Sequence, residues 1–91
     1  MNSQYLRVPL SVEVRFDADG QMIPLSLNYC DCRFFIDKVL SSRKYTPNIV
    51  PCRFPVEYTV MIEGYKKKIY YEKYSNKWFS IREFHANLPE V

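Results

Sequence analysis

The chain has 91 residues and a net charge of +3, a length that suits one domain, residues 1–91, with a single modest core. Aromatic residues make up 16% of it and glycine occurs only twice, a composition that favours strands over helices. No segment approaches the roughly 18 apolar residues of a membrane-spanning helix, and the N-terminus lacks the apolar core of a signal peptide. We therefore expect a cytoplasmic protein with no membrane partner.

Charge is distributed unevenly along the chain. Residues 41–82 hold nine basic and three acidic side chains, a net charge of +6. Residues 1–40 hold four basic and five acidic side chains, and residues 83–91 hold two acidic and no basic ones. A basic region within a nearly neutral chain favours an anionic partner.

The first elements predicted are a hairpin. Residues 10–16 alternate apolar and polar side chains and predict a strand, preceded by a frayed start over residues 1–6. Residues 17–20 predict a turn with Gly20 in the left-handed conformation, and residues 22–29 return as the partner strand. Because Pro24 has no N–H to donate, we expect this partner to be bulged or to lie at a sheet edge near its start.

The middle of the chain is ambiguous. Residues 33–41 fit a strand, and they also fit one face of a helix with Asp31 as its N-cap. The three prolines at positions 47, 51 and 55 prevent a regular ladder, so residues 45–55 are predicted to be a connector.

A three-stranded meander follows. Residues 56–63, 67–73 and 77–82 predict strands, joined by a turn at Gly64 and a second reversal at Ser75 and Asn76. A turn of helix is predicted over residues 83–87. We therefore predict an all-β fold, a small antiparallel β-barrel or curled sheet of five to six strands of the SH3-like or OB-like kind.

Four segments of the sequence carry a resemblance to a known family. They are VEVRFDADGQMIPLSL, FIDKVL, YTVMIEGYKKKIYYE and KWF. They resemble a family of short bacterial proteins that share a V-x-V-x-F-x-x-x-G-x-x-x-P-L opening, an I-D-x-V-L segment, a Y-T-V-x-I-x-G strand and a terminal W-F. The similarity spans most of residues 10–81. It implies a β-domain without an assigned activity, with related modules that sometimes accompany translesion-type DNA polymerases, and it favours a strand over residues 33–41.

Candidate metal ligands do not have the spacing of a metal site. Cys30, Cys32, Cys52 and the single His85 are the soft ligands available, but the C-x-x-C spacing of zinc sites is absent. An odd number of cysteines fits reduced thiols in the cytosol. Residues 17–20 begin like a calcium loop, yet Asn28 stands where the closing glutamate belongs, so a hairpin turn is the better interpretation. We predict no metal and no cofactor.

No arrangement typical of catalysis occurs either. A cysteine nucleophile needs a nearby base, and only a pairing of Cys52 with His85 could be proposed, without a motif around either residue. A glycine-rich phosphate loop and a cofactor fingerprint are both missing. We predict that the protein is not an enzyme.

The remaining feature is a run of lysines among aromatic residues. Lysines neutralise phosphates and aromatic rings stack on bases, so the meander predicts a nucleic-acid contact with six candidate residues, Lys66, Lys68, Tyr70, Lys73, Lys77 and Trp78. In an alternating strand Lys66 and Lys68 share a face with Tyr70, while Lys67 points to the other face. Two alternatives stay open: a solvated sheet edge with the aromatic residues in the core, and a protein partner that docks by strand addition.

Overall fold

The computed structural model describes residues 3–44 and 55–85. All regular secondary structure in this part of the chain is β-strand. Seven antiparallel strands form one sheet in the order β3-β2-β1-β7-β6-β5-β4. Their bounds are β1 Ser3–Phe16, β2 Met22–Tyr29, β3 Cys32–Phe35, β4 Lys38–Lys44, β5 Pro55–Ile62, β6 Tyr65–Glu72 and β7 Lys77–His85. The prediction of an all-β fold is confirmed, but the predicted number of five to six strands is wrong.

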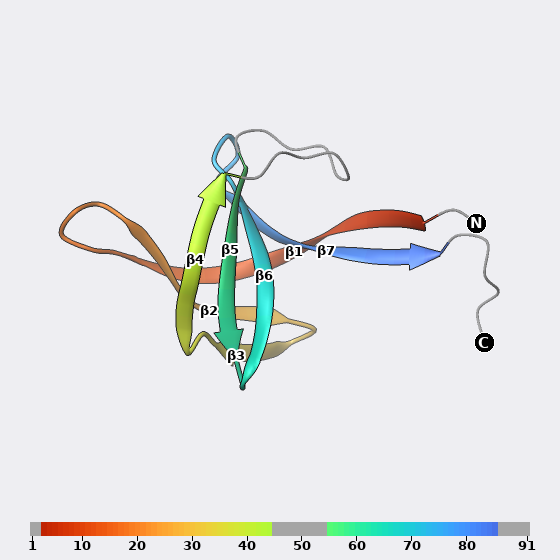
Figure 1. The fold of residues 1–91 in the computed structure, drawn as a ribbon, viewed down its shortest axis with the longest axis horizontal. Helices are drawn as coiled ribbons and strands as arrows, with labels where there is room; N and C mark the ends of the chain where they lie inside the picture. The colour runs from red at the N-terminus through yellow and green to blue at the C-terminus, as the bar shows by residue number, and fades with distance from the viewer. Residues whose placement is uncertain (1–2, 45–54, 86–91) are drawn as a thin grey trace.

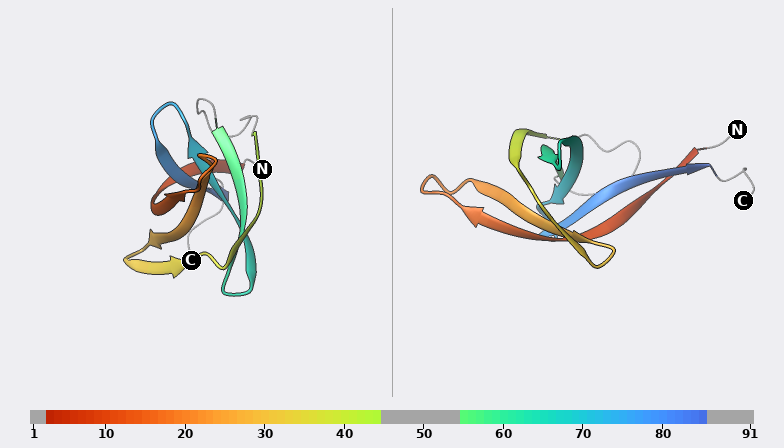
Figure 2. Two further views of the ribbon diagram at one scale, coloured as in Figure 1. Left: turned by 90° about the vertical axis from the view of Figure 1, so that its left-hand side faces the viewer. Right: turned by 90° about the horizontal axis from the view of Figure 1, so that it is seen from below.

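The extra strand arises at a bend between β3 and β4. The N–H of Ile36 bonds to the carbonyl of Leu25 on β2 at 2.9 Å, whereas the N–H of Asp37 bonds to the carbonyl of Met61 on β5 at 2.8 Å. The single strand expected over residues 33–41 is therefore two strands that pair with opposite ends of the sheet. This bend curls the sheet into a half-barrel (Figure 2).

The long strand β1 pairs with two different strands, one along each half of its length. Its residues 3–10 pair with β7, and its residues 11–16 pair with β2. Strands β4, β5 and β6 lie side by side and cross the direction of β1 (Figure 1). The expected frayed start is wrong for residues 3–6, and the expected helical turn is wrong for residues 83–85, because these two segments pair with each other.

The turns follow the sequence signals. Gly20 and Gly64 both have φ of +82°, and Asn76 has φ of +58°, so all three adopt the left-handed conformation that the hairpins need. Cys30 and Asp31 also have positive φ and make the reversal between β2 and β3. The reversals at Gly20, Gly64 and Asn76 confirm the predicted turns.

The predicted irregularity near Pro24 is a β-bulge. Glu13 pairs with Ser26 and Val14 pairs with Pro24, so Leu25 is an extra residue on β2. The bulge lets β2 carry a proline within a paired strand, because its neighbourhood already departs from the regular ladder.

The core fills the concave side of the half-barrel. Its buried members come from β2, β5, β6 and β7, and they are Leu27, Tyr58, Val60, Ile62, Ile69 and Trp78. On β5 the inward residues Tyr58, Val60 and Ile62 alternate with Glu57, Thr59 and Met61. The second set therefore faces the convex side of the sheet.

The predicted connector falls almost entirely on residues 45–54, which lie outside the described residues. Its last residue, Pro55, begins β5 and is buried. Within the described residues, the structure has no helix of the length and apolar character that crossing a membrane would require.

Candidate binding face

The convex face of β4, β5 and β6 collects basic side chains. Across these strands Lys38 and Lys66 both pair with Met61, and Lys68 pairs with Thr59. Arg43 pairs with Glu57 one step further along the same face. Directly paired residues share a face of a sheet, so four cations lie on one side of three adjacent strands. We call this set, Lys38, Arg43, Lys66 and Lys68, the lysine face.

The lysine run divides as its alternation predicts. Lys67 pairs with the core residue Val60, so it lies on the concave side, while Lys66 and Lys68 lie on the convex side. The ammonium of Lys67 is 5.8 Å from the ring centre of Tyr65, and both side chains are exposed. The three consecutive lysines therefore lie on two surfaces, Lys66 and Lys68 on the convex side and Lys67 on the concave side.

One buried carboxylate anchors the lysine face. The side chain of Glu57 is only 4% exposed, and its Oε1 accepts a 2.8 Å hydrogen bond from Nε of Arg43. The Nζ of Lys68 lies 3.9 Å from the same oxygen. Both cations keep more than half of their own side chains exposed. Glu57 thus holds them in place and offsets one of the four positive charges.

Two of the six predicted site residues are buried. Tyr70 is 8% exposed and stacks on Phe79 with ring centres 5.5 Å apart. Trp78 is 7% exposed and packs against Tyr58 and Tyr71, with ring centres 5.1 and 4.9 Å away. Their rings are packed within the protein, so they offer no open surface on which a base could stack.

The other predicted residues are exposed but fall in two places. Lys66 and Lys68 lie on the lysine face, whereas Lys73 lies in the turn between β6 and β7 and Lys77 begins β7 opposite Glu72. Lys73 also borders a shallow hollow with Tyr74 and the start of β5.

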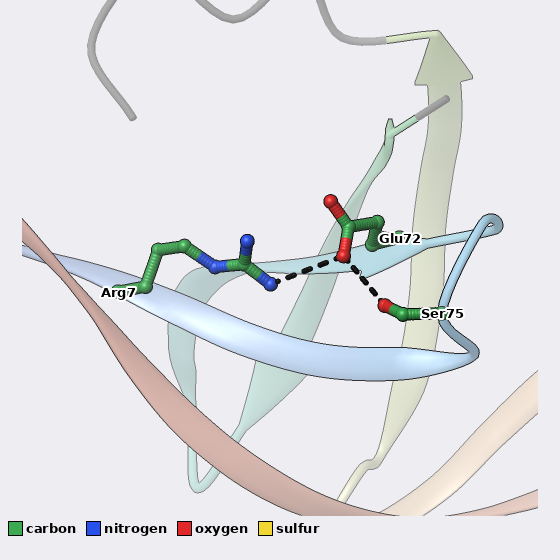
Figure 3. A network of polar contacts seen from close by, with 3 residues as sticks. All are labelled: Arg7, Glu72 and Ser75. Carbon is green, nitrogen blue, oxygen red and sulfur yellow. Dashed lines mark hydrogen bonds and ion pairs between the residues drawn. The ribbon is translucent and has the colours of Figure 1, made fainter. Parts of the chain in front are cut away.

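A polar network that sequence reasoning missed lies beside that turn. Glu72 Oε1 accepts a hydrogen bond from Oγ of Ser75 at 2.5 Å and from a terminal nitrogen of Arg7 at 3.4 Å (Figure 3). The guanidinium carbon of Arg7 lies 4.2 Å from the centre of the Phe79 ring. Arg7 is 65 positions away from Glu72, and only the pairing of β1 with β7 brings it there.

A second missed feature is an apolar groove on the concave side. It has a volume of about 430 Å³, and it lies where β6 and β7 separate. Its apolar lining includes Leu10, Leu27, Phe34, Ile62 and Ile69, and Tyr29, Tyr65 and Lys67 also line it. No local pattern signals the groove, because its walls come from β1, β2, β3, β5, β6 and β7.

The candidate metal ligands are dispersed. Cys30, on the turn between β2 and β3, and Cys32, at the start of β3, are free and exposed thiols. His85 pairs with Ser3 at the end of β7, and Cys52 lies outside the described residues. Over residues 3–44 and 55–85, no group of three or more His, Cys, Asp or Glu side chains is placed to hold a metal ion.

The calcium-like segment is a hairpin turn. The Oδ1 of Asp17 accepts hydrogen bonds from the N–H groups of Asp19 and Gln21, both at 2.9 Å. The N–H of Gly20 bonds to the carbonyl of Asp17 at 2.9 Å. The Asp17 carboxylate therefore satisfies the backbone of its own turn.

Comparison of the chain with protein-family models, with curated proteins and with solved structures finds no match.

Proposed function

We propose that this chain is a non-enzymatic binding module whose lysine face contacts the phosphates of a nucleic acid. The observation that supports it is the convex surface of β4, β5 and β6, where Lys38, Arg43, Lys66 and Lys68 lie around the buried carboxylate of Glu57. In this proposal the half-barrel is of the SH3-like or OB-like kind, and the module works in the cytoplasm.

The proposed contact is electrostatic, without base stacking. Lysine side chains bind phosphate as mobile point charges and release condensed counterions from the nucleic acid. Tyr70 and Trp78 are packed in the protein interior, so they contribute by shaping the sheet and not by touching bases. The proposal therefore predicts binding with little sequence preference and a steep dependence on salt.

Hydroxyl groups between the cations add to the proposed site. Ser41 and Thr59 are paired on the lysine face, and Thr59 is paired in turn with Lys68. Serine and threonine hydroxyls donate hydrogen bonds to phosphate oxygens. The resemblance of residues 10–81 to the bacterial family is part of this proposal, with a role beside a DNA polymerase as the setting in which such a contact would serve.

The test is salt-dependent binding of single-stranded DNA and RNA to two matched double variants. Changing Lys66 and Lys68 to Gln should weaken binding and reduce the slope of log affinity against log salt by roughly one per lost contact. Changing Lys67 and Arg82 to Gln removes the same charge from positions outside the lysine face and should leave more of the slope intact. Absence of binding at low salt, or an equal effect of the two pairs, contradicts the proposal.

A further inference from the structure

Strand β6 has an unpaired edge along half its length. It pairs with β7 only at Tyr70, Tyr71 and Glu72. Beyond Tyr70 the two strands diverge, because β7 continues alongside β1 up to the pair of Ser3 with His85. Within the described part of the chain, residues 65–69 pair with β5 alone.

The register shows which backbone groups this edge presents. A two-residue turn at Glu63 and Gly64 joins Ile62 to its partner Tyr65, and such a turn closes on a hydrogen-bonded pair. Hydrogen-bonded and non-hydrogen-bonded pairs alternate along an antiparallel ladder. The N–H and C=O groups of Lys66 and Lys68 therefore point away from β5, in the direction that Tyr70 uses to pair with β7.

The apolar groove lies beside this edge. Lys67, Lys68 and Ile69 of β6 line it together with core residues such as Leu27 and Ile62. A strand added to β6 would place alternate side chains over the groove and the others over the convex side, next to Lys66 and Lys68.

The edge of β4 is a poorer candidate for the same role. Lys38 and Val39 pair with Met61 and Val60, but the next pair is Ser41 with Thr59, so Leu40 is an extra residue that forms a bulge. Bulges disrupt the regular ladder and protect sheet edges from pairing with other chains. The register of β6 with β5 is continuous from Tyr65 to Glu72.

We propose that β6 binds an extended acidic segment of another protein by strand addition, with apolar side chains in the groove and carboxylates beside Lys66 and Lys68. A second copy of this chain does not suit the site, because antiparallel pairing of two β6 edges would bring lysines against lysines. This site shares Lys66 and Lys68 with the lysine face, but it also uses the backbone edge and the concave side of β6, which the lysine face does not use.

The test uses a blocked ten-residue peptide of alternating valine and glutamate, with a valine–lysine peptide as the control for charge. Binding is followed by nuclear magnetic resonance and by hydrogen exchange of the backbone amides. The valine–glutamate peptide should slow exchange of the Lys66 and Lys68 N–H groups, which face solvent in the free protein, and shift the signals of Leu27 and Ile69. The valine–lysine peptide should do neither.

Two variants at one position separate the backbone contact from the charge. Lys66→Pro removes the outward N–H without removing a bond to β5, and edge strands tolerate proline at such a position. It should weaken peptide binding at least roughly tenfold, the loss expected for one unmade hydrogen bond. Lys66→Gln keeps the N–H and should weaken binding only about twofold. If Lys66→Pro unfolds, wild-type protein with a peptide N-methylated at alternate residues gives the same comparison.

Three results overturn the inference. The first is that neither Lys66→Pro nor N-methylation of the peptide changes the affinity for the peptide. The second is that the peptide does not slow hydrogen exchange of the Lys66 and Lys68 N–H groups. The third is that the signals of Leu27 and Ile69 shift with oligothymidylate but not with the peptide. The last result would assign the groove to nucleic acid. The salt dependence of DNA binding by the Lys66 and Lys68 double change to Gln tests the lysine face, whereas Lys66→Pro and the N-methylated peptide test the strand edge, so each proposal has its own measurement.

Discussion

Arg43 on β4 donates a 2.8 Å hydrogen bond to Glu57 on β5, a residue whose side chain is only 4% exposed. Lys68 on β6 lies 3.9 Å from the same carboxylate oxygen. One buried anion thus links three neighbouring strands through the cations that form the proposed binding face. The same contact limits that face, because Glu57 competes with any external phosphate for Arg43 and Lys68.

Glu57→Gln should therefore strengthen nucleic-acid binding while it weakens the fold. The change frees Arg43 and Lys68 for phosphate and should steepen the salt dependence of binding. It should lower the free energy of unfolding by about 1 kcal/mol, a modest loss because both cations already reach water. Urea unfolding and DNA titration measure the two effects. Glu63→Gln, at an exposed turn position, is the control, and weaker DNA binding by Glu57→Gln would contradict the proposed face.

Arg7→Met should destabilise the protein by about 1–2 kcal/mol. The change removes the cation over Phe79, 4.2 Å from the ring centre, and a hydrogen bond to the Glu72 carboxylate, whose side chain is 9% exposed. Arg7→Lys should lower the free energy of unfolding by a smaller but still measurable amount, because an ammonium keeps the charge but lacks the planar group that covers the ring.

Urea unfolding of the two Arg7 variants measures this effect. Arg15→Met, on the same strand at an exposed position, is the matched control and should change the free energy of unfolding by less than about 0.5 kcal/mol. Equal stability of the Arg7 and Arg15 variants would show that the network in Figure 3 contributes nothing measurable.

The sequence predicts local structure well where a turn or an alternation carries the information. Gly20, Gly64 and Asn76 adopt the positive φ expected of them, and the alternation around the lysine run assigns Lys66 and Lys68 to one face and Lys67 to the other. Pro24 correctly indicated an irregular strand, because a residue without an N–H demands a local departure from the ladder.

What the sequence does not predict depends on pairings between distant segments. Alternation places Tyr70 on a face, but it does not reveal that Phe79 and Arg7 cover that face. The bend at Ile36 and Asp37 is equally hidden, since it is defined by hydrogen bonds to two different strands. The separation of β6 from β7, which opens the groove, follows from the long pairing of β7 with β1.

Gly64 should tolerate asparagine better than other residues. Its φ is +82°, and a Cβ placed there meets nothing within 4 Å, so the cost of substitution comes from the backbone and not from a clash. Gly64→Ala should lower the free energy of unfolding by about 1 kcal/mol. The loss should be smaller for Gly64→Asn, because asparagine tolerates the left-handed region, and larger for Gly64→Val, because β-branched residues avoid it. Thermal unfolding of the three variants gives the order. Equal losses for Asn and Val would mean that the turn changes its conformation.

Tyr58 should make the fold sensitive to alkali. Burial, together with the charge of nearby Tyr71, raises the pKa of Tyr58 above its ordinary value of 10.0. The folded chain then keeps a proton that the unfolded chain loses, so the free energy of unfolding is unaffected by this group well below pH 10 and falls as pH rises from there towards the folded pKa.

Tyr58→Phe keeps the ring beside Trp78, 5.1 Å between centres, and removes the ionisation. Urea unfolding between about pH 8 and pH 11 should show a flatter decline for Tyr58→Phe than for the wild type, and no such flattening for the exposed control Tyr74→Phe. A decline of the same slope in all three proteins would exclude Tyr58 as its source.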